Sequence, residues 1–303
     1  MLGNFLEKYF LKLKLCSILH KIINSIIYLT YRHPIVITGW VIVRYGRLLH
    51  RNWGDDINVY LIERMTGKRV VVQNCSVYHR LFYRGPVYSC IGSILNWYEA
   101  SSKIVWGSGL INSEGCIPPL KICSVRGPET RKRLLELGIH CPEQYGDPAL
   151  LISRYYTAIP LSRKYKIGVI PHHSDIDNLV LRSFVEKYPD DVLLINLTIY
   201  KHWTDIPNMV VSCDCILSSS LHGLIVADSY GVPNSWICLS NKVYGGDFKF
   251  NDYFSSVQRQ EKRIIIKSMA DLENLLTSPT TKCDAVIDYE AIAASAPFTL
   301  KQQ

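Results

Sequence analysis

Residues 213–239, CDCILSSSLHGLIVADSYGVPNSWICL, contain the pattern that decides the fold. An apolar run of strand length ends in three serines, a segment of helix length follows, and a glycine and a proline precede a second apolar run. Short strands that alternate with helices favour a mostly parallel sheet covered by helices. The serines and His222 therefore fall at the carboxyl end of a strand, where ligands bind in open sheets of this kind.

The same alternation extends through the chain from residue 35 onward. Strands are predicted over 35–43, 70–72, 87–91, 103–106, 121–125, 166–170, 192–197, 213–217, 234–239 and 263–266. Helices are predicted over 57–66, 128–137, 176–188, 221–230 and 289–296, with a further helix capped by Ser268. A looser stretch over 153–166 separates two series of elements. The sequence thus predicts an α/β protein with domains over 33–155 and 156–303, preceded by a helix within 1–32.

Composition places the chain among ordinary folded proteins. Of its 303 residues 48% are hydrophobic and 20% are charged, which excludes disordered and collagen-like classes. Ten cysteines are too dilute for a disulfide scaffold and show no C-x-x-C spacing. Alternation along a strand explains Cys213 and Cys215 better than zinc binding does. We therefore expect reduced thiols, a cytoplasmic location and no metal site.

The positive charge is concentrated at the N-terminus. Residues 1–51 contain eight basic residues and one acid, so this segment carries +7 of the total +8. A nucleic-acid-binding protein would spread basic residues over the folded domain, so we expect no nucleic-acid partner. The apolar stretch 5–31 is interrupted by lysines, and its longest charge-free run, 22–31, is too short to cross a bilayer. Two interpretations of this basic amphipathic helix remain: peripheral binding to an anionic membrane, or packing against a protein.

Several groups at predicted strand ends are candidates for chemistry. Asp55 and Asp56 precede a predicted helix, where each is a candidate for its N-cap or for a general base. The Gly-rich turn 106–109 can bring backbone N–H groups to a phosphate, but the dinucleotide and P-loop fingerprints are missing from the sequence. Arg126 follows a strand, and its guanidinium either binds a carboxylate or phosphate, or pairs with Glu129 or Asp147.

Three further groups lie in the second half of the chain. His172 follows strand 166–170 and is a candidate anion ligand, although two adjacent histidines cannot both face the same way in an extended chain. Ser219, Ser220 and His222 lie at the start of a helix, where hydroxyls, N–H groups and an imidazole favour an anion. The segment 245–253 reads as a loop with glycine hinges, either a mobile flap that closes Lys249 over a phosphate or a plain surface loop.

Eight stretches in order resemble the polysaccharide pyruvyl transferase family, and especially its exopolysaccharide and capsule members. They are NWGDDINVYLIERMTGK, IGSIL, WGSGL, VRGPETRKRLLELGI, YGDPALL, IGVIPHHSD, SSSLHGLIVADSYGVP and FKFNDYF. The resemblance implies two Rossmann-like domains in a glycosyltransferase-B-like arrangement and phosphoenolpyruvate as donor substrate, without a cofactor. It also implies a hexose acceptor, in a polysaccharide or its lipid-linked repeat unit, that becomes a cyclic pyruvate ketal as phosphate is released.

The same resemblance assigns roles to individual residues. It implies donor binding by Arg126 and by Ser219, Ser220 and Leu221, with His222 as the proton donor to the methylene carbon. Lys249 or Lys242 would supply a second cation, His172 a further contact, and Asp55 or Asp56 the base. One departure stands out: many members have Arg-Leu-His where this chain has Ser220-Leu221-His222, so that another cation, such as Lys249, would compensate.

Two other functions were weighed. A nucleotide-sugar glycosyltransferase on the same scaffold would have a carboxylate that grips ribose, and no E-x(7)-E pattern follows the Ser-Leu-His stretch. A non-catalytic scaffold protein of a membrane polysaccharide machine would use the basic N-terminus to dock. In that case the histidines and Arg126 would be dispensable.

Overall fold

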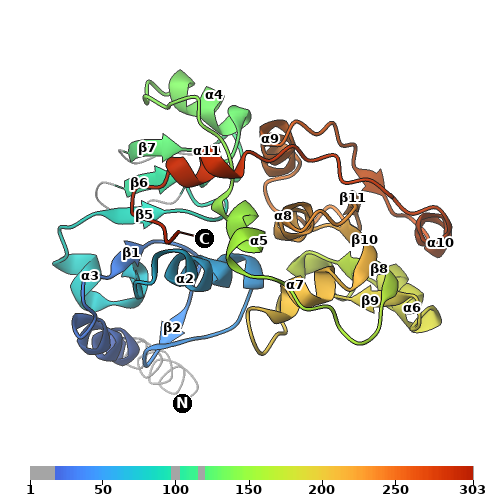
Figure 1. The fold of residues 1–303 in the computed structure, drawn as a ribbon, viewed down its shortest axis with the longest axis horizontal. Helices are drawn as coiled ribbons and strands as arrows, with labels where there is room; N and C mark the ends of the chain where they lie inside the picture. The colour runs from blue at the N-terminus through green and yellow to red at the C-terminus, as the bar shows by residue number, and fades with distance from the viewer. Residues whose placement is uncertain (1–17, 97–102, 115–119, 303) are drawn as a thin grey trace, which may run out of the picture.

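Two parallel sheets with helices around them form the computed structural model, which describes residues 18–96, 103–114 and 120–302 (Figure 1). The first sheet has the order β4-β1-β5-β6-β7, and the second β12-β11-β10-β8-β9. All recorded pairs in both sheets are parallel. The predicted α/β class with parallel sheets is therefore confirmed.

The elements of the first half are β1 (Ile35–Ile37), β2 (Val43–Arg44), β3 (Arg47–Leu48), α2 (Trp53–Thr66), β4 (Val70–Val72), α3 (Val77–Leu81), β5 (Val87–Ser89), β6 (Lys103–Trp106), β7 (Leu120–Ser124) and α4 (Pro128–Glu136). The short helices η2 (Pro148–Leu151) and α5 (Ile152–Tyr155) lead to the second half. That half contains β8 (Tyr165–Ile170), η3 (His173–Asp175), α6 (Leu179–Lys187), β9 (Val192–Leu194), α7 (Asp205–Val210), β10 (Cys213–Ser218), α8 (Leu221–Ser229), β11 (Asn234–Cys238), α9 (Phe248–Ser256), β12 (Ile264–Ile265) and α10 (Met269–Thr277).

The unit β10-α8-β11 forms as its sequence predicts. Ile216 pairs with Asn234 and Ser218 with Trp236 in parallel register. Cys213 and Cys215 alternate with the exposed Asp214 along β10, and the cysteines recorded in the described residues are free thiols. Nearly every residue of α8 is buried, because this helix packs between the sheet and the rest of the molecule.

Three differences between the predicted elements and the structure bear on the candidate site or its surroundings. The strand expected over 35–43 ends at Ile37, before Gly39, and the apolar residues that follow lead into the β2-β3 hairpin. The helix expected to begin near residue 57 begins at Trp53, because the Asn52 side chain accepts a hydrogen bond from Gly54 N at 3.2 Å. Neither Asp55 nor Asp56 is therefore the N-cap.

The third difference concerns the loop expected over 245–253. Its second part is the helix α9, whose buried face contains Lys249 and Asp252 as well as three aromatic residues. Polar residues on a buried helix face hide the apolar periodicity on which the prediction relied. The interpretation of this segment as a plain surface loop with a solvated lysine is therefore wrong, and the flap that closes Lys249 over a phosphate stays a prediction.

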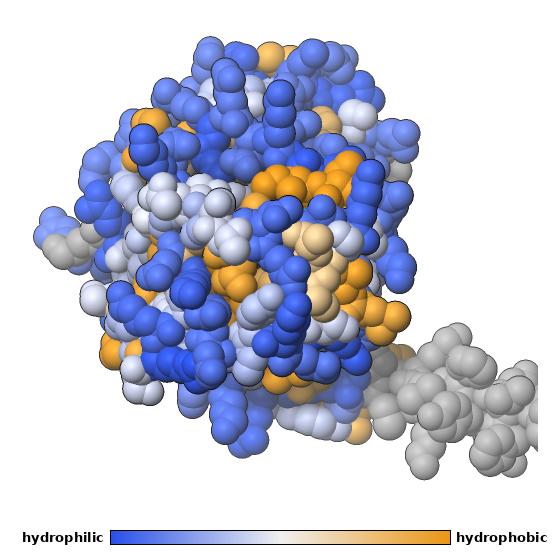
Figure 2. All heavy atoms as spheres, turned by 90° about the vertical axis from the view of Figure 1, so that its right-hand side faces the viewer, coloured by the Kyte–Doolittle hydropathy of each residue, from blue (hydrophilic) through white to orange (hydrophobic). Residues whose placement is uncertain are grey.

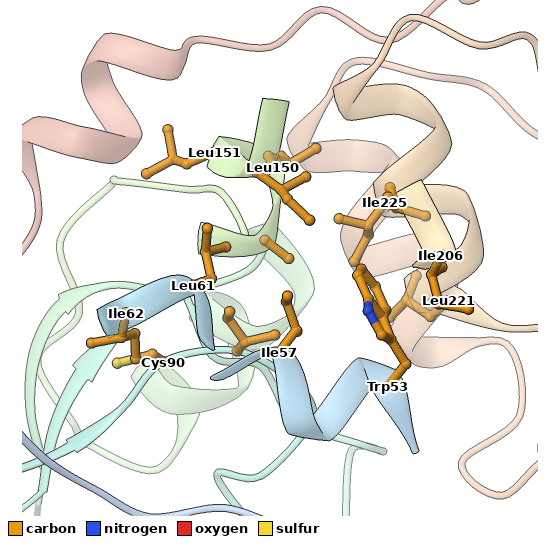
Figure 3. Close-up of a cluster of buried hydrophobic side chains, with 14 of the residues drawn as sticks. Trp53, Ile57, Leu61, Ile62, Cys90, Leu150, Leu151, Ile206, Leu221 and Ile225 are labelled. Atoms are coloured by element: carbon orange, nitrogen blue, oxygen red, sulfur yellow. The ribbon is translucent and has the colours of Figure 1, made fainter. Parts of the chain in front are cut away.

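One hydrophobic core connects the two halves. Trp53, from α2, lies against Leu221 and Ile225 of α8 and Ile206 of α7 (Figure 3). The Trp53 indole donates a hydrogen bond to Trp203 O at 2.7 Å, and its backbone N–H donates to Leu197 O at 2.8 Å. The start of α2 is thus held by the second half, while the rest of the helix packs on the first sheet.

The end of the chain returns to the first half. The helix α11 (Tyr289–Ala294) lies beside β6 and β7 in Figure 1. The Trp106 indole donates to Ile292 O at 3.0 Å, and the Gln144 amide donates to Ala291 O at 3.1 Å. The C-terminal helices thus divide between the halves, and the boundaries at 33–155 and 156–303 remain a prediction.

Residues 18–29 are helical and pack beside α3 at the edge of the first half (Figure 1). The part of the predicted N-terminal helix in 1–17 lies outside the described residues. No helix among the described residues is long and apolar enough to cross a membrane. The side of the molecule seen in Figure 2 is mainly hydrophilic, with hydrophobic residues gathered near its centre.

Candidate anion-binding site

Five side chains from different elements influence one another electrostatically. They are Asp55 in the first turn of α2, Arg126 after β7, His172 after β8, His222 in the first turn of α8, and Lys249 in the first turn of α9. We call these five residues the strand-end cluster. The chain positions of its members range from 55 to 249, and both halves contribute.

The N-termini of α2 and α8 approach each other closely in this cluster. A Cβ atom added to Gly54 would lie 2.2 Å from the Nδ1 atom of His222, so only glycine fits there without moving the imidazole. The Nε2 atom of His222 is buried and has no hydrogen-bond partner among the described residues. A buried polar atom without a partner is costly, and a ligand held there would relieve the cost.

Burial and like charge lower the pKa values of the basic members. Burial, with Lys249 and Arg126 nearby, lowers the pKa of His222 to about 3. Burial and the neighbours His173, Lys249 and His222 lower the pKa of His172 to about 3. Burial and the positive charge of Arg126 lower the pKa of Lys249 to about 8. An anion placed among these groups would stabilise their protonated forms and raise the three pKa values.

The structure separates the two candidate aspartates. Asp56 is 1% exposed and accepts hydrogen bonds from Tyr200 Oη at 2.6 Å and Arg51 N at 3.1 Å, so it holds the chain before α2 in place. Asp55 accepts a hydrogen bond from the Asn52 amide at 2.8 Å and faces the charge of Lys249. Burial, together with repulsion from Asp56, raises the pKa of Asp55 to about 7, which suits a group that transfers protons near neutrality.

Arg126 lies fully buried and is paired. Its guanidinium contacts Asp252 Oδ2 through Nε at 2.9 Å and Nη2 at 2.8 Å, and it also donates to Leu110 O at 2.7 Å and to Ser93 Oγ. The sequence suggested Glu129 or Asp147 as the partner of Arg126, and the structure shows that the partner is Asp252 instead. Each of the three guanidinium nitrogens donates one of these hydrogen bonds, and Asp252 already balances the charge, so Arg126 acts on a ligand mainly through its charge.

The sequence did not indicate a role for Asp252, a residue of α9 that binds both Arg126 and the first turn of α4. Besides Arg126, it accepts hydrogen bonds from Thr130 N at 2.8 Å and Thr130 Oγ1 at 2.7 Å, in the first turn of α4. Gly127 is the N-cap of α4 and has no side chain that could cap the helix. It lies against the backbone of α9, because a Cβ atom added to it would be 1.8 Å from Asp252 O. A carboxylate on α9 thus caps α4. Asp252 lies three residues after Lys249, and this spacing indicates that the two side chains share a helix face only if the segment is recognised as helical.

Two of the three serines at the end of β10 stabilise the turn between β10 and α8. Ser218 Oγ donates to Ile170 O and accepts from Ser220 N, and Ser219 Oγ bridges His172 N and Asp175. Ser220 is the N-cap of α8, but its side chain makes no capping hydrogen bond. Leu221 packs in the core against Trp53 (Figure 3). Among these serines, Ser220 is the one whose hydroxyl makes no hydrogen bond to another described residue, so it is available to a ligand.

The histidines after β8 do not sit in an extended chain. His173 begins η3, and the two imidazole rings pack with centroids 4.0 Å apart. The expectation that adjacent histidines face opposite ways holds for an extended chain and therefore does not apply here. Ser174 N donates to His172 Nδ1 at 3.3 Å, so in the neutral ring the proton is on Nε2. Neutral His172 is thus a hydrogen-bond donor through Nε2.

Only one of the two candidate lysines joins the cluster. Lys249 is 8% exposed and donates to Tyr244 O at 3.1 Å, whereas Lys242 is exposed on the loop before α9. A cavity of about 160 Å³ lies next to this loop, at the carboxyl ends of β10 and β11. It is lined by Ser219, Trp236, Asn241, Phe250 and Arg263, among others. Within the described residues no three His, Cys, Asp or Glu side chains form a group that could hold a metal ion.

The chain is thus an α/β protein with parallel sheets, and its strand ends bring basic side chains and helix N-termini together in a candidate anion-binding site. A family profile described as polysaccharide pyruvyl transferase matches residues 4–242. The chain belongs to this family, which assigns it a transferase role in polysaccharide pyruvylation. The resemblance found in the sequence is thereby confirmed.

Two known proteins are similar to this chain. The succinoglycan biosynthesis protein ExoV of Rhizobium meliloti (strain 1021) is 27% identical over 242 residues, which cover 75% of this chain and 69% of that protein. Uncharacterized protein L143 of Acanthamoeba polyphaga mimivirus is 27% identical over 248 residues, which cover 78% of this chain and 83% of that protein. No solved structure matches the chain significantly.

Proposed function

We propose that this protein transfers pyruvate from phosphoenolpyruvate to a hexose of an exopolysaccharide or capsule and forms a cyclic ketal. The observation that carries the proposal is the strand-end cluster, in which Lys249 interacts with Asp55, His172, His222 and Arg126. A donor with a phosphate and a carboxylate group supplies the negative charge that this group of side chains lacks. Family membership and the relative named for succinoglycan biosynthesis support a saccharide as the acceptor.

The reaction needs one acid, one base and stabilisation of charge. A proton adds to C3 of phosphoenolpyruvate, and a hexose hydroxyl forms a bond to the cationic C2 and gives up its proton. The second hydroxyl then bonds to C2 as the C2–O bond to phosphate breaks, and its proton is carried off with the phosphate. The two protons lost by the hydroxyls thus balance those gained by C3 and phosphate, and no cofactor is required.

His222 and Asp55 take the two proton-transfer roles in this proposal. Donor binding places negative charge beside His222 and raises its pKa, so that the imidazole becomes protonated and can deliver a proton to C3. Asp55, whose pKa is raised to about 7, accepts the proton of the attacking hydroxyl. Arg126 and Lys249 neutralise the phosphate and carboxylate, with His172 and Ser220 as further hydrogen-bonding groups.

Lys249 takes the place of the arginine that many family members have at the position of Ser220. Its buried ammonium lies within the electrostatic reach of Asp55, His172 and His222. We further propose that the two halves form a glycosyltransferase-B-like pair with the donor between them. The reaction would then take place in the cytoplasm, on a polymer or on its lipid-linked repeat unit.

The test is phosphate release from phosphoenolpyruvate in the presence of a panel of hexosides, with the product examined by NMR for a ketal methyl signal. We expect release to require both substrates. His222→Ala should lower kcat by about a hundredfold or more, the usual contribution of a positioned general acid. Gly54→Ala should have a similar effect, because its Cβ displaces the imidazole.

Matched controls separate the site from the fold. His202→Ala changes an exposed histidine, and Gly39→Ala adds a Cβ whose nearest neighbour is 3.8 Å away, so both should retain wild-type rates. If phosphoenolpyruvate neither reacts with any hexoside nor raises the Tm, the donor assignment is wrong. Transfer from a nucleotide sugar instead would establish a glycosyltransferase.

A further inference from the structure

The helix at residues 18–29 leaves one apolar face exposed. Its exposed large side chains are Ile18, Leu19, Ile22, Ile26 and Leu29, with exposures between 44% and 62%. At 3.6 residues per turn these five positions fall within an arc of about 100°. Isolated exposed apolar residues are ordinary on a protein surface, but a complete helix face is not.

The opposite face fixes the helix to the domain. The Asn24 amide donates to Val43 O at 2.8 Å and Cys75 O at 2.9 Å, and Gly46 N donates to Asn24 Oδ1 at 2.8 Å. Tyr28 is buried, and its ring lies 5.7 Å from that of His79. The β2-β3 hairpin and α3 therefore flank the helix, and its exposed face cannot turn inward without breaking these contacts.

The flanking elements extend the apolar face and surround it with positive charge. Tyr45 on the hairpin, and Tyr78, Leu81 and Phe82 at α3, are exposed aromatic or aliphatic side chains. Arg44, Arg47, Arg80 and Arg84 lie exposed on the same two elements or next to them. We call this surface, with the helix face, the N-terminal apolar surface.

Acidic residues are missing from the sequence of this region. None occurs between Glu7 and Asp55, or between Glu63 and Glu99, and these two segments contain the helix, the hairpin and α3. The acids between these two segments are Asp55, Asp56 and Glu63 of α2, and Glu63 forms an ion pair with Arg69 at 3.6 Å. An apolar face with basic residues around it and no acids matches a surface that is both apolar and anionic.

We propose that the N-terminal apolar surface docks on an anionic lipid bilayer. The helix lies in the plane of the interface, its Ile and Leu side chains enter the headgroup region, and the arginines contact anionic headgroups. The exposed side chains of Tyr45 and Tyr78 also suit the headgroup region, because each combines an apolar ring with a polar hydroxyl. This docking is independent of the transfer reaction and would hold the protein beside acceptors that are attached to lipid.

Co-sedimentation of the full chain with vesicles tests the proposal. We expect binding to vesicles of phosphatidylcholine with 30% phosphatidylglycerol that weakens as salt is raised, and little binding to phosphatidylcholine alone. Arg44→Gln with Arg47→Gln should weaken binding about thirtyfold, since each basic residue near the surface contributes about a fivefold factor. Ile26→Gln with Leu29→Gln should weaken it about tenfold or more.

The control changes two exposed aliphatic residues outside the surface, Leu179→Gln and Ile199→Gln, which are 79% and 73% exposed. This variant should bind vesicles as the wild type does. Because none of these residues belongs to the strand-end cluster, every variant should turn over soluble substrates at an unchanged rate. A failure of the proposed reaction would therefore leave the binding result intact.

Two outcomes would overturn the proposal. One is wild-type protein that stays in the supernatant with anionic vesicles at low salt. The other is an Ile26→Gln/Leu29→Gln variant that binds vesicles normally but converts a dimer to a monomer in light scattering. The second result would make the surface a contact between two copies of this chain.

Discussion

His172, His222 and Lys249 have lowered pKa values because burial removes water and the neighbouring cations repel one another. With no anion present, the two histidines, with pKa values of about 3, are neutral at pH 8, and Lys249, with a pKa of about 8, is about half protonated. A bound anion would add negative charge beside these groups and raise all three pKa values. Binding and protonation are therefore coupled at these residues.

We predict that phosphoenolpyruvate binding takes up protons at pH 8. Titration calorimetry in two buffers of different ionisation enthalpy measures this uptake. Lys249→Arg keeps the positive charge but cannot deprotonate, so it should reduce the uptake at pH 8 while retaining binding. Affinity should fall as the pH rises above 8 in the wild type and fall less in this variant. Equal heats in the two buffers would contradict the coupling.

At the scale of elements, α9 connects the two halves through a buried ion pair. Asp252 and Arg126 are both 0% exposed, and the same carboxylate caps α4 through Thr130. Breaking a buried pair by removing one charge costs about 3–5 kcal/mol, because the other charge remains buried without compensation. An exposed pair contributes about 0–1 kcal/mol.

Asp252→Asn should therefore lower the free energy of unfolding by about 3–5 kcal/mol, measured by urea denaturation. The variant should also raise the KM for phosphoenolpyruvate, since the orientation of Arg126 depends on this carboxylate. Asp247→Asn is the matched control at the N-cap of the same helix, because Asp247 makes no side-chain cap and pairs with Arg263 at a partly exposed site. Equal losses in both variants would show that the buried pair has no special role.

Across the whole molecule, a single hydrophobic cluster contains residues from both sheets. Trp53 lies where the halves meet, 1% exposed, with its indole bonded to Trp203 O. A core shared in this way makes the unfolding of one half expose the apolar surface of the other. The two halves should thus lose their structure together.

We predict one unfolding transition, with coincident far-UV circular dichroism and tryptophan fluorescence. Trp53→Ala should lower the free energy of unfolding by about 3–5 kcal/mol, the usual cost of truncating a large buried aromatic residue. Phe82→Ala, at a residue that is 63% exposed, should change it by less than about 1 kcal/mol. Two separate transitions in the wild type would mean that the halves are energetically independent.

Local patterns in the sequence determined the α/β class and most of the strands. The apolar period and the helix cap at Ser268 depend on neighbouring residues, and the structure contains that cap where it was expected. The chemical types in the cluster were also visible, because Asp55, Arg126, His172 and His222 follow strands or begin helices. The family resemblance came from the same stretches.

Only the tertiary structure decided which groups are paired and which are left for a ligand. Arg126 and Asp252 are 126 residues apart, and their contact depends on how the two halves pack. Asp55 differs from Asp56 because one faces Lys249 and the other Tyr200. Lys249 belongs to the cluster because α9 buries it. Pairing and desolvation depend on groups distant in the chain, so local sequence patterns cannot encode them by themselves.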